Sequence, residues 1–408
     1  MIRIALYSHD TMGLGHVRRN LLIAQELASS SLQATILLIT GVHTASCLRI
    51  PAGVDCLTLP ALYKKVDGQY RSRHLNVSLQ ELSYLRAMTI RAALMAFEPD
   101  VLIVDNVPRG AMRELEPSLE DLKANNQRRC ILGLRDVLDE PATIRREWQQ
   151  AQNEDAIRKY YDAIWVYGDP DVCDPAREHS FPPDIAAKVR YTGYFDQRKR
   201  LKPEASASPL AGLDLSSGRL ALCLAGGGQD GVRLTKAFAQ AELPPGFNGV
   251  ILTGPFMPSK ALQCLHHIAA QQSRLDVLEF MPEPCLLLGH ADRIIAMGGY
   301  NTTCEVLSFE KPALIVPRVS PRREQLIRAK RLRDLGLIDL LHPGKLSPAA
   351  LTHWLASDVL PKPRARDRID MNALQRLPAL LAEALGASPI GLPVLSTAKR
   401  LSRPHRVF

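Results

Sequence analysis

The chain has 408 residues, too many for one ordinary core, so we expect two domains. Its hydrophobic content of 46% and charged content of 23% are normal for a globular protein that folds in water. The eight cysteines are scattered, without a CxxC motif or a Cys/His cluster, which argues against a zinc site and favours a reducing, cytoplasmic setting. Neither a signal segment nor an apolar run of the roughly 20 residues that a membrane helix needs is visible.

The formal net charge of +9 indicates which kinds of molecule the protein could bind. Aromatic residues make up only 5% and no recognised nucleic-acid-binding motif is present, so we expect no nucleic-acid partner. Anionic small molecules, or the negative inner face of a membrane, fit better, so a peripheral contact with the inner membrane face is a further expectation. Plain solubility is the competing explanation of such diffuse charge.

Short apolar segments alternate with helix-length segments through the first half of the chain. Strands are predicted at 2–7, 34–40, 55–59, 100–104, 129–134 and 163–167, and helices at 16–29 and 79–97. This alternation predicts a parallel sheet covered on both faces, in a Rossmann-like N-terminal domain at 1–195. The charged and then Pro-, Ala- and Ser-rich segment 196–217 is the predicted linker.

The alternation restarts after the linker. Strands are predicted at 219–225, 249–253, 275–280, 294–296 and 313–316, and helices at 232–241 and 374–385. We expect a second Rossmann-like domain at 218–386 and a basic, flexible tail at 387–408. Two such α/β domains facing one another form a cleft, with ligands at the carboxyl ends of the strands.

The segment 291–318 carries the clearest signal of a binding site. A buried strand runs into Gly298 and Gly299, and a helical pattern begins at Asn301 and Thr302. Because a helix N-terminus has unpaired N–H groups and a partial positive charge, this turn predicts a diphosphate site. Glu305 follows closely, where its carboxylate could bind the vicinal hydroxyls of a ribose. A structural explanation competes, because Thr302 and Glu305 also fit a T-x-x-E capping box.

Two further segments of the second half fit a nucleotide site. After the next strand come Arg318 and Arg322, whose guanidinium groups could neutralise a diphosphate, and then Gln325. A glycine-rich loop follows the first strand of this half and is expected to approach a phosphate or a sugar rather than form an idle turn. Its residues are Gly226, Gly227, Gly228 and Gln229.

In the first half, a GLGH segment follows the first strand. Gly13 and Gly15 would let the loop approach a ligand, and His16 would open the next helix with its imidazole in the cleft. Histidine titrates near neutrality, which suits a general base that removes a proton from a hydroxyl. The alternative is that His16 only fills the domain interface.

Polar residues follow two other strands of the first half. Asp105 comes at the end of a buried strand and could orient His16 through a hydrogen bond to one ring nitrogen, or simply form a turn. Arg135 and Asp136 follow the neighbouring strand and could bind an acceptor or pair with each other.

Taken together, these motifs resemble the GT-B glycosyltransferases that carry a family-28-like C-terminal donor domain, such as the bacterial peptidoglycan N-acetylglucosaminyltransferases. The resemblance lies in GGGQDG, in FMPEPCLLLGHADRIIAMGGYNTTCE and in PALIVPR with REQLIRAKRL, in that order over most of 219–336. The GLGH segment resembles the acceptor-side loop of the family, whereas the rest of the first half matches weakly.

The resemblance implies roles for single residues. Glu305 would bind the ribose, Gly298, Gly299, Asn301 and Thr302 would lie at the diphosphate, and Gln325 would contact the donor sugar. Backbone at Phe280 and Met281 would meet the base, which implies uridine. The family pattern has Asn before the alanine that corresponds to Ala329, whereas this chain has Arg328 there.

The predicted function is therefore an inverting transfer of a sugar from a UDP-sugar to a hydroxyl acceptor, without a metal or other cofactor. The acceptor is unknown, and a lipid-linked one is an expectation drawn from the resemblance. Three other hypotheses stay open. Gly13–Arg19 fits the GxGHxxR pattern of nucleotide-sugar hydrolases that resemble this family, a 2-epimerase shares the GT-B architecture, and a non-catalytic regulator could bind the same nucleotide sugar.

Overall fold

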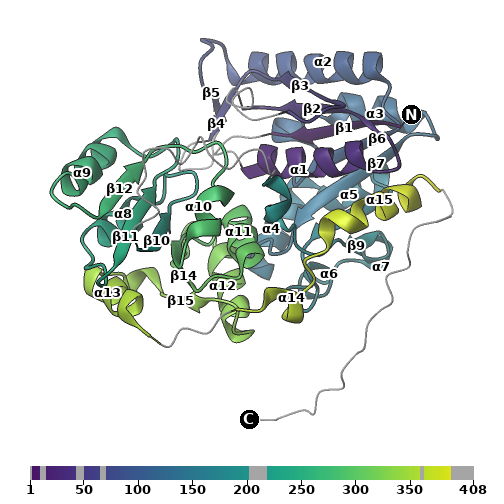
Figure 1. Cartoon of the computed structure of the whole chain (residues 1–408). Helices are drawn as coiled ribbons and strands as arrows, with labels where there is room; N and C mark the ends of the chain where they lie inside the picture. Colours follow the sequence, from purple (N-terminus) through teal and green to yellow (C-terminus); the bar gives the residue numbers. More distant parts are fainter. Residues whose placement is uncertain are drawn as a thin grey trace.

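The structure is a computed structural model that describes residues 2–9, 15–42, 50–64, 70–201, 218–358 and 363–386. Gly13, most of the predicted linker and the predicted tail 387–408 lie outside the described residues. Figure 1 shows two α/β units side by side, one built on the early strands and one on the later strands.

The first unit is built on a seven-stranded parallel sheet with the strand order β3-β2-β1-β6-β7-β8-β9. Aliphatic runs such as VLIVD form its centre, because strands covered on both faces bury nearly every side chain. Its strands are β1 (Arg3–Ser8), β2 (Thr35–Thr40), β3 (Val54–Thr58), β6 (Val101–Asp105), β7 (Arg129–Arg135), β8 (Ala163–Tyr167) and β9 (Val189–Tyr191). A separate antiparallel pair joins β4 (Leu62–Lys64) to β5 (Tyr70–Ser72).

The second unit is built on a six-stranded parallel sheet with the order β12-β11-β10-β13-β14-β15. Its strands are β10 (Arg219–Leu224), β11 (Phe247–Leu252), β12 (Leu275–Leu278), β13 (Arg293–Ala296), β14 (Ala313–Ile315) and β15 (Asp339–Leu340). The predicted fold class, two parallel Rossmann-like sheets, is therefore confirmed. In each sheet the strand order reverses once, between β1 and β6 and between β10 and β13, and ligands bind at such points.

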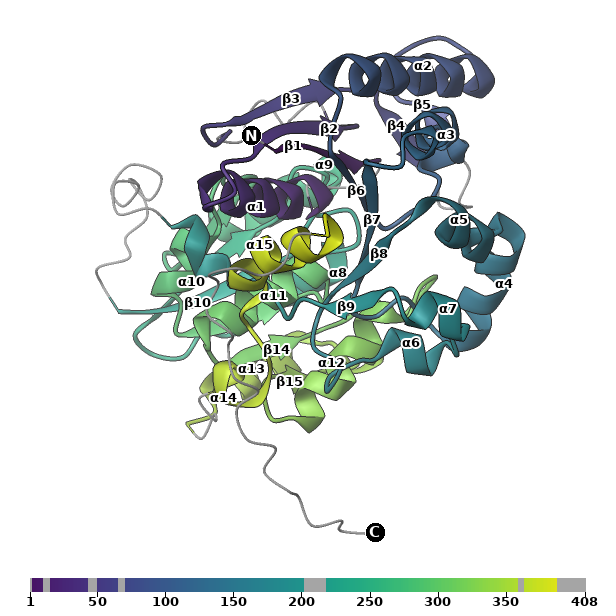
Figure 2. The ribbon, with the colours of Figure 1, turned by 90° about the vertical axis from the view of Figure 1, so that its right-hand side faces the viewer.

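Helices cover both faces of each sheet (Figure 2). In the first unit these are α1 (Gly15–Ser29), α2 (Leu79–Phe97), α3 (Glu116–Ala124), α4 (Pro141–Ala151), α5 (Asn153–Tyr160), α6 (Pro175–Glu178) and α7 (Pro183–Ala186), with 3-10 turns η2 (Ala111–Arg113) and η3 (Gln197–Arg200). The later helices are α8 (Val232–Ala239), α9 (Ser259–Ala269), α10 (Cys285–His290), α11 (Tyr300–Phe309), α12 (Glu324–Asp334), α13 (Pro348–Ala356), α14 (Ala365–Arg368) and α15 (Ala373–Ala384), with the turn η5 (Pro343–Lys345).

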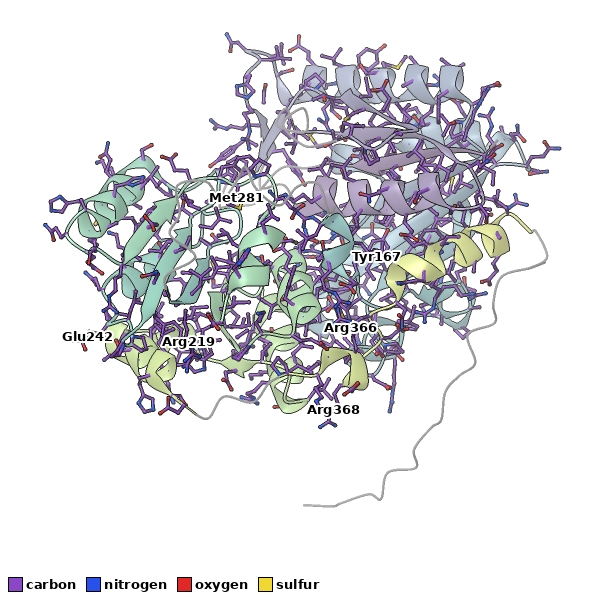
Figure 3. All side chains as sticks on the ribbon, viewed as in Figure 1. Tyr167, Arg219, Glu242, Met281, Arg366 and Arg368 are labelled. Atoms are coloured by element: carbon purple, nitrogen blue, oxygen red, sulfur yellow. The ribbon has the colours of Figure 1, made fainter. Side chains whose placement is uncertain are left out.

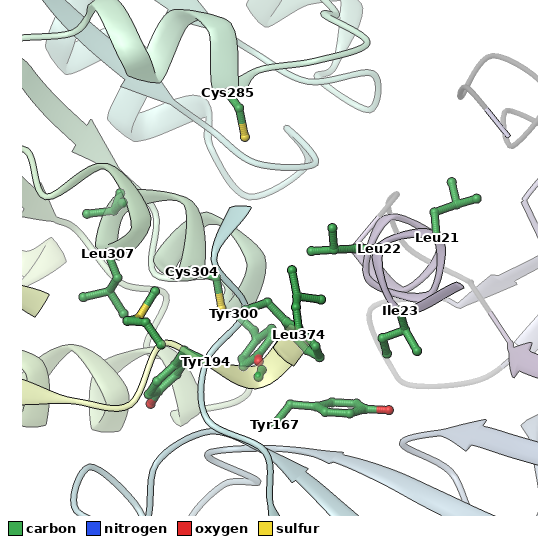
Figure 4. Packing of buried hydrophobic residues seen from close by; sticks show 14 of the residues in the cluster. Leu21, Leu22, Ile23, Tyr167, Tyr194, Cys285, Tyr300, Cys304, Leu307 and Leu374 are labelled. Carbon is green, nitrogen blue, oxygen red and sulfur yellow. The ribbon is translucent and has the colours of Figure 1, made fainter. Parts of the chain in front are cut away.

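One hydrophobic core runs between the two sheets. It joins α1 and the first sheet to α10, α11 and α12 of the second unit, through residues such as Leu22, Tyr167, Tyr300 and Leu374. Figure 4 shows Tyr300 and Leu374 close to α1 and to Tyr167. The cleft between the units is therefore largely closed by packed side chains in this conformation.

The last helix departs from the predicted division of the chain. We expected 218–386 to form the second domain, but α15 packs against α1 on the first sheet. Tyr194 N donates to Asp370 O at 2.7 Å, and Arg190 pairs with Glu383 at 2.8 Å. The chain thus returns to the first unit, because the apolar face of α15 completes the cover of that sheet.

Candidate functional site

The two predicted halves of the site meet at the carboxyl ends of both sheets, where each strand order reverses. His16 is the second residue of α1, the helix after β1, and Asp105 ends β6, the next strand across the reversal. His16 Nδ1 lies 2.7 Å from Asp105 Oδ2. Arg19, one turn further along α1, donates to both oxygens of the same carboxylate, at 2.6 and 2.5 Å.

Asp105 is fully buried in this cluster. Burial alone would raise the pKa of its carboxyl, but the Arg19 guanidinium and His16 more than offset that effect and hold the pKa well below its usual range. His16 Nδ1 faces both the Asp105 carboxylate and Arg19 Nη2, the latter at 3.0 Å. In the tautomer that carries its proton on Nδ1, towards the carboxylate, Nε2 is the nitrogen that can accept a proton. The structure thus brings His16 and Asp105 within hydrogen-bond distance, as predicted. Arg19 is a further partner of Asp105.

A second histidine lies beside this cluster. The rings of His9 and His16 have centroids 5.3 Å apart, and His9 is buried at the end of β1. His9 was not predicted, and Arg19 was predicted only as the last residue of the GxGHxxR pattern. A signal for His9 was available, because a histidine directly after the first buried strand falls at the same sheet edge as the GLGH segment.

The second half of the site is the N-terminus of α11. Gly299 is the N-cap, and no side chain caps the helix. Thr302 therefore lies inside the helix, and the capping-box explanation of Thr302 and Glu305 is wrong. The glycine loop after β10 comes close to this turn, since a Cβ on Gly226 would lie 3.9 Å from Thr302 Oγ1.

Two glycines of this region are required by their surroundings. Gly228 has a φ of +98°, and a Cβ there would lie 2.5 Å from Thr253 O. At Gly298 a Cβ would lie 3.3 Å from the Cβ of Gln325, which brings α12 against the turn. A Cβ on Gly299, in contrast, would meet nothing within 4 Å. Gly227 and Gln229 are exposed in the loop after β10.

Glu305 is buried and bound by an arginine from the end of the first unit. Arg200 Nη1 donates to Glu305 Oε1 at 3.0 Å, and Arg200 also pairs with Glu283 at 2.9 Å. Among the described residues, Arg200 bonds Oε1 of Glu305 and no hydrogen bond reaches its Oε2. The predicted ribose ligand is thus held in place by Arg200, which the sequence analysis did not single out.

The two halves touch directly. Asn301 Nδ2 donates to Gly15 O at 2.7 Å, and a Cβ on Gly15 would lie 2.6 Å from the same nitrogen. Arg18 Nη2 donates to Met281 O at 3.1 Å, so the carbonyl expected near a base is engaged by the first unit. Figure 3 labels Met281 where the second unit comes up against the first. Phe280 beside it is exposed.

The remaining predicted residues lie in ion pairs. Arg318 binds Asp230 at 2.9 Å and Glu324 at 2.6 Å, while its backbone N–H donates to Gln325 Oε1 at 3.0 Å. Arg322 pairs across the interface with Glu147 at 2.8 Å. In this conformation neither arginine is free for a diphosphate.

Asp136 does not pair with Arg135. Its carboxylate is fully buried and binds Arg328 at 2.6 Å, and Tyr194 donates to it at 2.8 Å. Arg328, the residue that departs from the family pattern, thus ties α12 to the first sheet. It also donates to Gly298 O at 3.2 Å, directly before α11.

A cavity of about 540 Å³ lies elsewhere, between α6 and α12, and contains none of the predicted site residues. Within the described ranges, no group of three His, Cys, Asp or Glu side chains is placed to hold a metal ion. Among the described helices, none is both long enough and apolar enough to cross a bilayer.

Comparison with known proteins supports the sequence resemblance. Residues 225–383 match the Glycosyltransferase family 28 C-terminal domain. The Haemophilus influenzae (strain PittGG) UDP-N-acetylglucosamine–N-acetylmuramyl-(pentapeptide) pyrophosphoryl-undecaprenol N-acetylglucosamine transferase is 28% identical over 82 residues, 20% of this chain and 23% of that protein. The chain thus aligns with about a quarter of that relative. An uncharacterized glycosyltransferase of Methanosarcina mazei is 22% identical over 378 residues, 90% of this chain and 91% of that protein.

Solved structures share the whole architecture. The calicheamicin glycosyltransferase CalG4 has a TM-score of 0.58 at 16% identity, covering 95% of this chain and 98% of its own. The UDP-GlcNAc 2-epimerase from Neisseria meningitidis, bound to UDP-GlcNAc, has a TM-score of 0.62 at 14% identity, covering 94% and 99%. These likenesses define the fold, and a transferase and an epimerase share it.

Two facing Rossmann-like units with this architecture define the GT-B fold, which the chain shares with these structures. The match to the glycosyltransferase family 28 C-terminal domain, over residues 225–383, covers most of the second unit together with α15.

Proposed function

We propose that the chain transfers a sugar from a UDP-sugar to a hydroxyl acceptor, with inversion and without a metal ion. The observation that carries this proposal is the pair His16–Asp105 at one switch point, in contact through Gly15–Asn301 with the uncapped helix N-terminus at the other. This contact supports a pairing of a general base with a diphosphate site, which sugar transfer to a hydroxyl needs.

In the proposed reaction these groups account for the bond that breaks, the bond that forms and the proton that moves. The bond between the sugar C1 and the β-phosphate oxygen breaks, and its electron pair leaves with UDP. The acceptor oxygen bonds C1 from the opposite face, and its proton passes to Nε2 of His16. Asp105 keeps the other ring nitrogen protonated, and the N–H groups at the start of α11 stabilise the leaving diphosphate. Glu305, held by Arg200, would bind the ribose.

The test uses purified protein, a panel of labelled UDP-sugars and a cell lipid extract. UDP release that requires the extract supports transfer to a lipid-linked acceptor, and release into water alone supports the hydrolase hypothesis. Interconversion of epimers supports the 2-epimerase, and binding without turnover supports the regulator. Turnover that survives His16→Ala refutes the base assignment, and unchanged UDP affinity in Glu305→Gln refutes the ribose assignment.

One surface of the first unit supports the expected contact with a membrane. One side of α2 exposes Tyr84, Leu85, Met88 and Met95. The exposed fraction of Tyr84 is 69%. The segment 70–78 before α2 contains Arg71 and Arg73 and no acidic residue. We therefore propose that this side of α2 lies against an anionic bilayer, since apolar and basic groups together favour that interface.

A vesicle assay tests the bilayer contact. We expect the protein to sediment with vesicles that contain anionic phospholipid, and the variant Leu85→Ser, Met88→Ser to lose most of that binding. The control Met112→Ser changes a partly buried methionine off this side. Equal binding of the double variant and the wild type would refute the proposed surface.

A further inference from the structure

Arg135 occupies the sheet edge between the two halves of the site. It is the last residue of β7, and its register partner on β8 is Tyr167. Gly133, two residues earlier, is the register partner of Asp105. Because side chains alternate along a strand and register partners point the same way, Arg135 lies on the same side of the sheet as Asp105 and Tyr167. This is the side that faces the second unit.

Arg135 lacks a partner within the described part of the chain. Its Nε is buried, and no hydrogen bond or ion pair joins it to any described residue. The neighbouring arginines are different, since Arg19 has Asp105, Arg328 has Asp136, and Arg318 has Glu324. The side chain as a whole is partly exposed, so its guanidinium has a buried, unpartnered Nε and a side open to a ligand, an arrangement that a bound anion would complete.

The surroundings of Arg135 are polar and rich in cations. Burial, and then the charges of Arg19 and Arg328, lower the pKa of Arg135, while Glu324 acts in the opposite direction. Two more buried oxygens lack a partner among the described residues, the Tyr167 hydroxyl and Glu324 Oε2. Unpaired donors and acceptors in one place indicate a site that a polar ligand completes.

The position of the neighbours indicates which anion this is. Arg19 lies 5.3 Å and Arg328 5.5 Å from the ring centroid of Tyr300, the first residue of α11. Arg328 also donates to Gly298 O. The cations that act on Arg135 therefore surround the helix N-terminus where the diphosphate would sit.

We propose that Arg135 is a catalytic residue of the first unit that binds the donor diphosphate and stabilises the charge that develops on it as the sugar leaves. This inference rests on the proposed function. It assigns leaving-group stabilisation to both units, so the site is complete only when they are closed.

Calorimetric binding of UDP and of uridine tests the assignment. In Arg135→Met we expect UDP to bind about 10- to 100-fold more weakly and uridine to bind within about twofold of wild type, because only UDP carries the phosphates. Arg135→Lys should fall between, since lysine keeps the charge without the fork. Arg91→Met, which changes an arginine paired with Asp121 away from the cleft, should bind both ligands as the wild type does.

The outcomes separate the two proposals. Equal weakening of UDP and uridine would mean that Arg135 only supports the fold, and the inference would be overturned. Unchanged UDP affinity with lost turnover would place the anion on the acceptor instead, which also overturns it while leaving the proposed function intact. If the wild type binds neither UDP nor uridine, the proposed function itself fails, and the inference fails with it.

Discussion

Replacing Asp105 with asparagine tests the core of the proposed mechanism. The carboxylate is fully buried and neutralises Arg19, whose side chain is only 2% exposed. Asparagine keeps the shape but removes the charge, so Arg19 becomes a buried cation without a counter-charge. Breaking a buried pair in this way costs about 3–5 kcal/mol of unfolding free energy. The amide can also no longer fix the tautomer of His16 as a carboxylate does.

The effect on turnover should exceed the effect on folding. General-base catalysis contributes about 10²–10⁴-fold to rate, and we expect Asp105→Asn to lose a factor of that size in kcat/KM under conditions where it is still folded. The matched control is Glu114→Gln. Glu114 and Arg86 form another fully buried pair in the first unit, with Arg86 Nε donating at 2.6 Å.

The assay follows UDP release at saturating UDP-sugar, beside urea unfolding of each variant. Both variants should lose stability, but only Asp105→Asn should lose turnover once each is compared as folded protein. If Glu114→Gln loses as much kcat/KM as Asp105→Asn, the loss reports weakened folding and the catalytic role of Asp105 is refuted.

The other predictions concern the interface and pH. Gly15→Ala should raise the KM for the donor about tenfold, because its Cβ would lie 2.6 Å from Asn301 Nδ2 and would push aside the side chain that joins the two halves of the site. Arg328→Met should lower the free energy of unfolding, measured in urea, by about 3–5 kcal/mol. Arg323→Met should change it by at most about 1 kcal/mol, because the side chain of Arg323 in its pair with Glu140 is 46% exposed. The pKa of Asp105 is depressed in the folded state, so its stabilisation is present above about pH 4 and is lost as the pH falls below that value. The difference between the urea midpoints of wild type and Asp105→Asn should therefore be constant above about pH 5 and shrink steadily as the pH falls below about 4.

Much of the fold followed from periodicity. The predicted helix at Leu79–Phe97 and the strand at Ala163–Tyr167 agree with the structure to the residue, because buried aliphatic runs and a capping Ser78 mark them. Strand β9 escaped prediction, since its three residues are half buried and carry no periodic pattern. The pairing of α15 with α1 joins residues far apart in the chain, which local pattern cannot indicate.

The candidate site divides in the same way. The placement of Asp105 was predictable because it ends a buried strand, and that of His16 and Asn301 because each lies at the start of the helix that follows such a strand, where the fold brings ligand-binding residues together. The ion pairs were not. Arg200 binds Glu305 across 105 residues and Arg328 binds Asp136 across 192, and nothing in the local sequence selects those partners among many arginines.

The return of α15 to the first sheet limits how this protein could have evolved. A single recombination event between residues 202 and 217 would give each product a second unit that carries another protein's α15. That helix would then have to pack against an α1 with which it has not coevolved. Exchange of a whole donor unit between relatives therefore needs two crossovers, one before β10 and one before α14. Proteins with this architecture should inherit the first sheet and the last helix together, and the sequence of α15 should vary in step with that of α1.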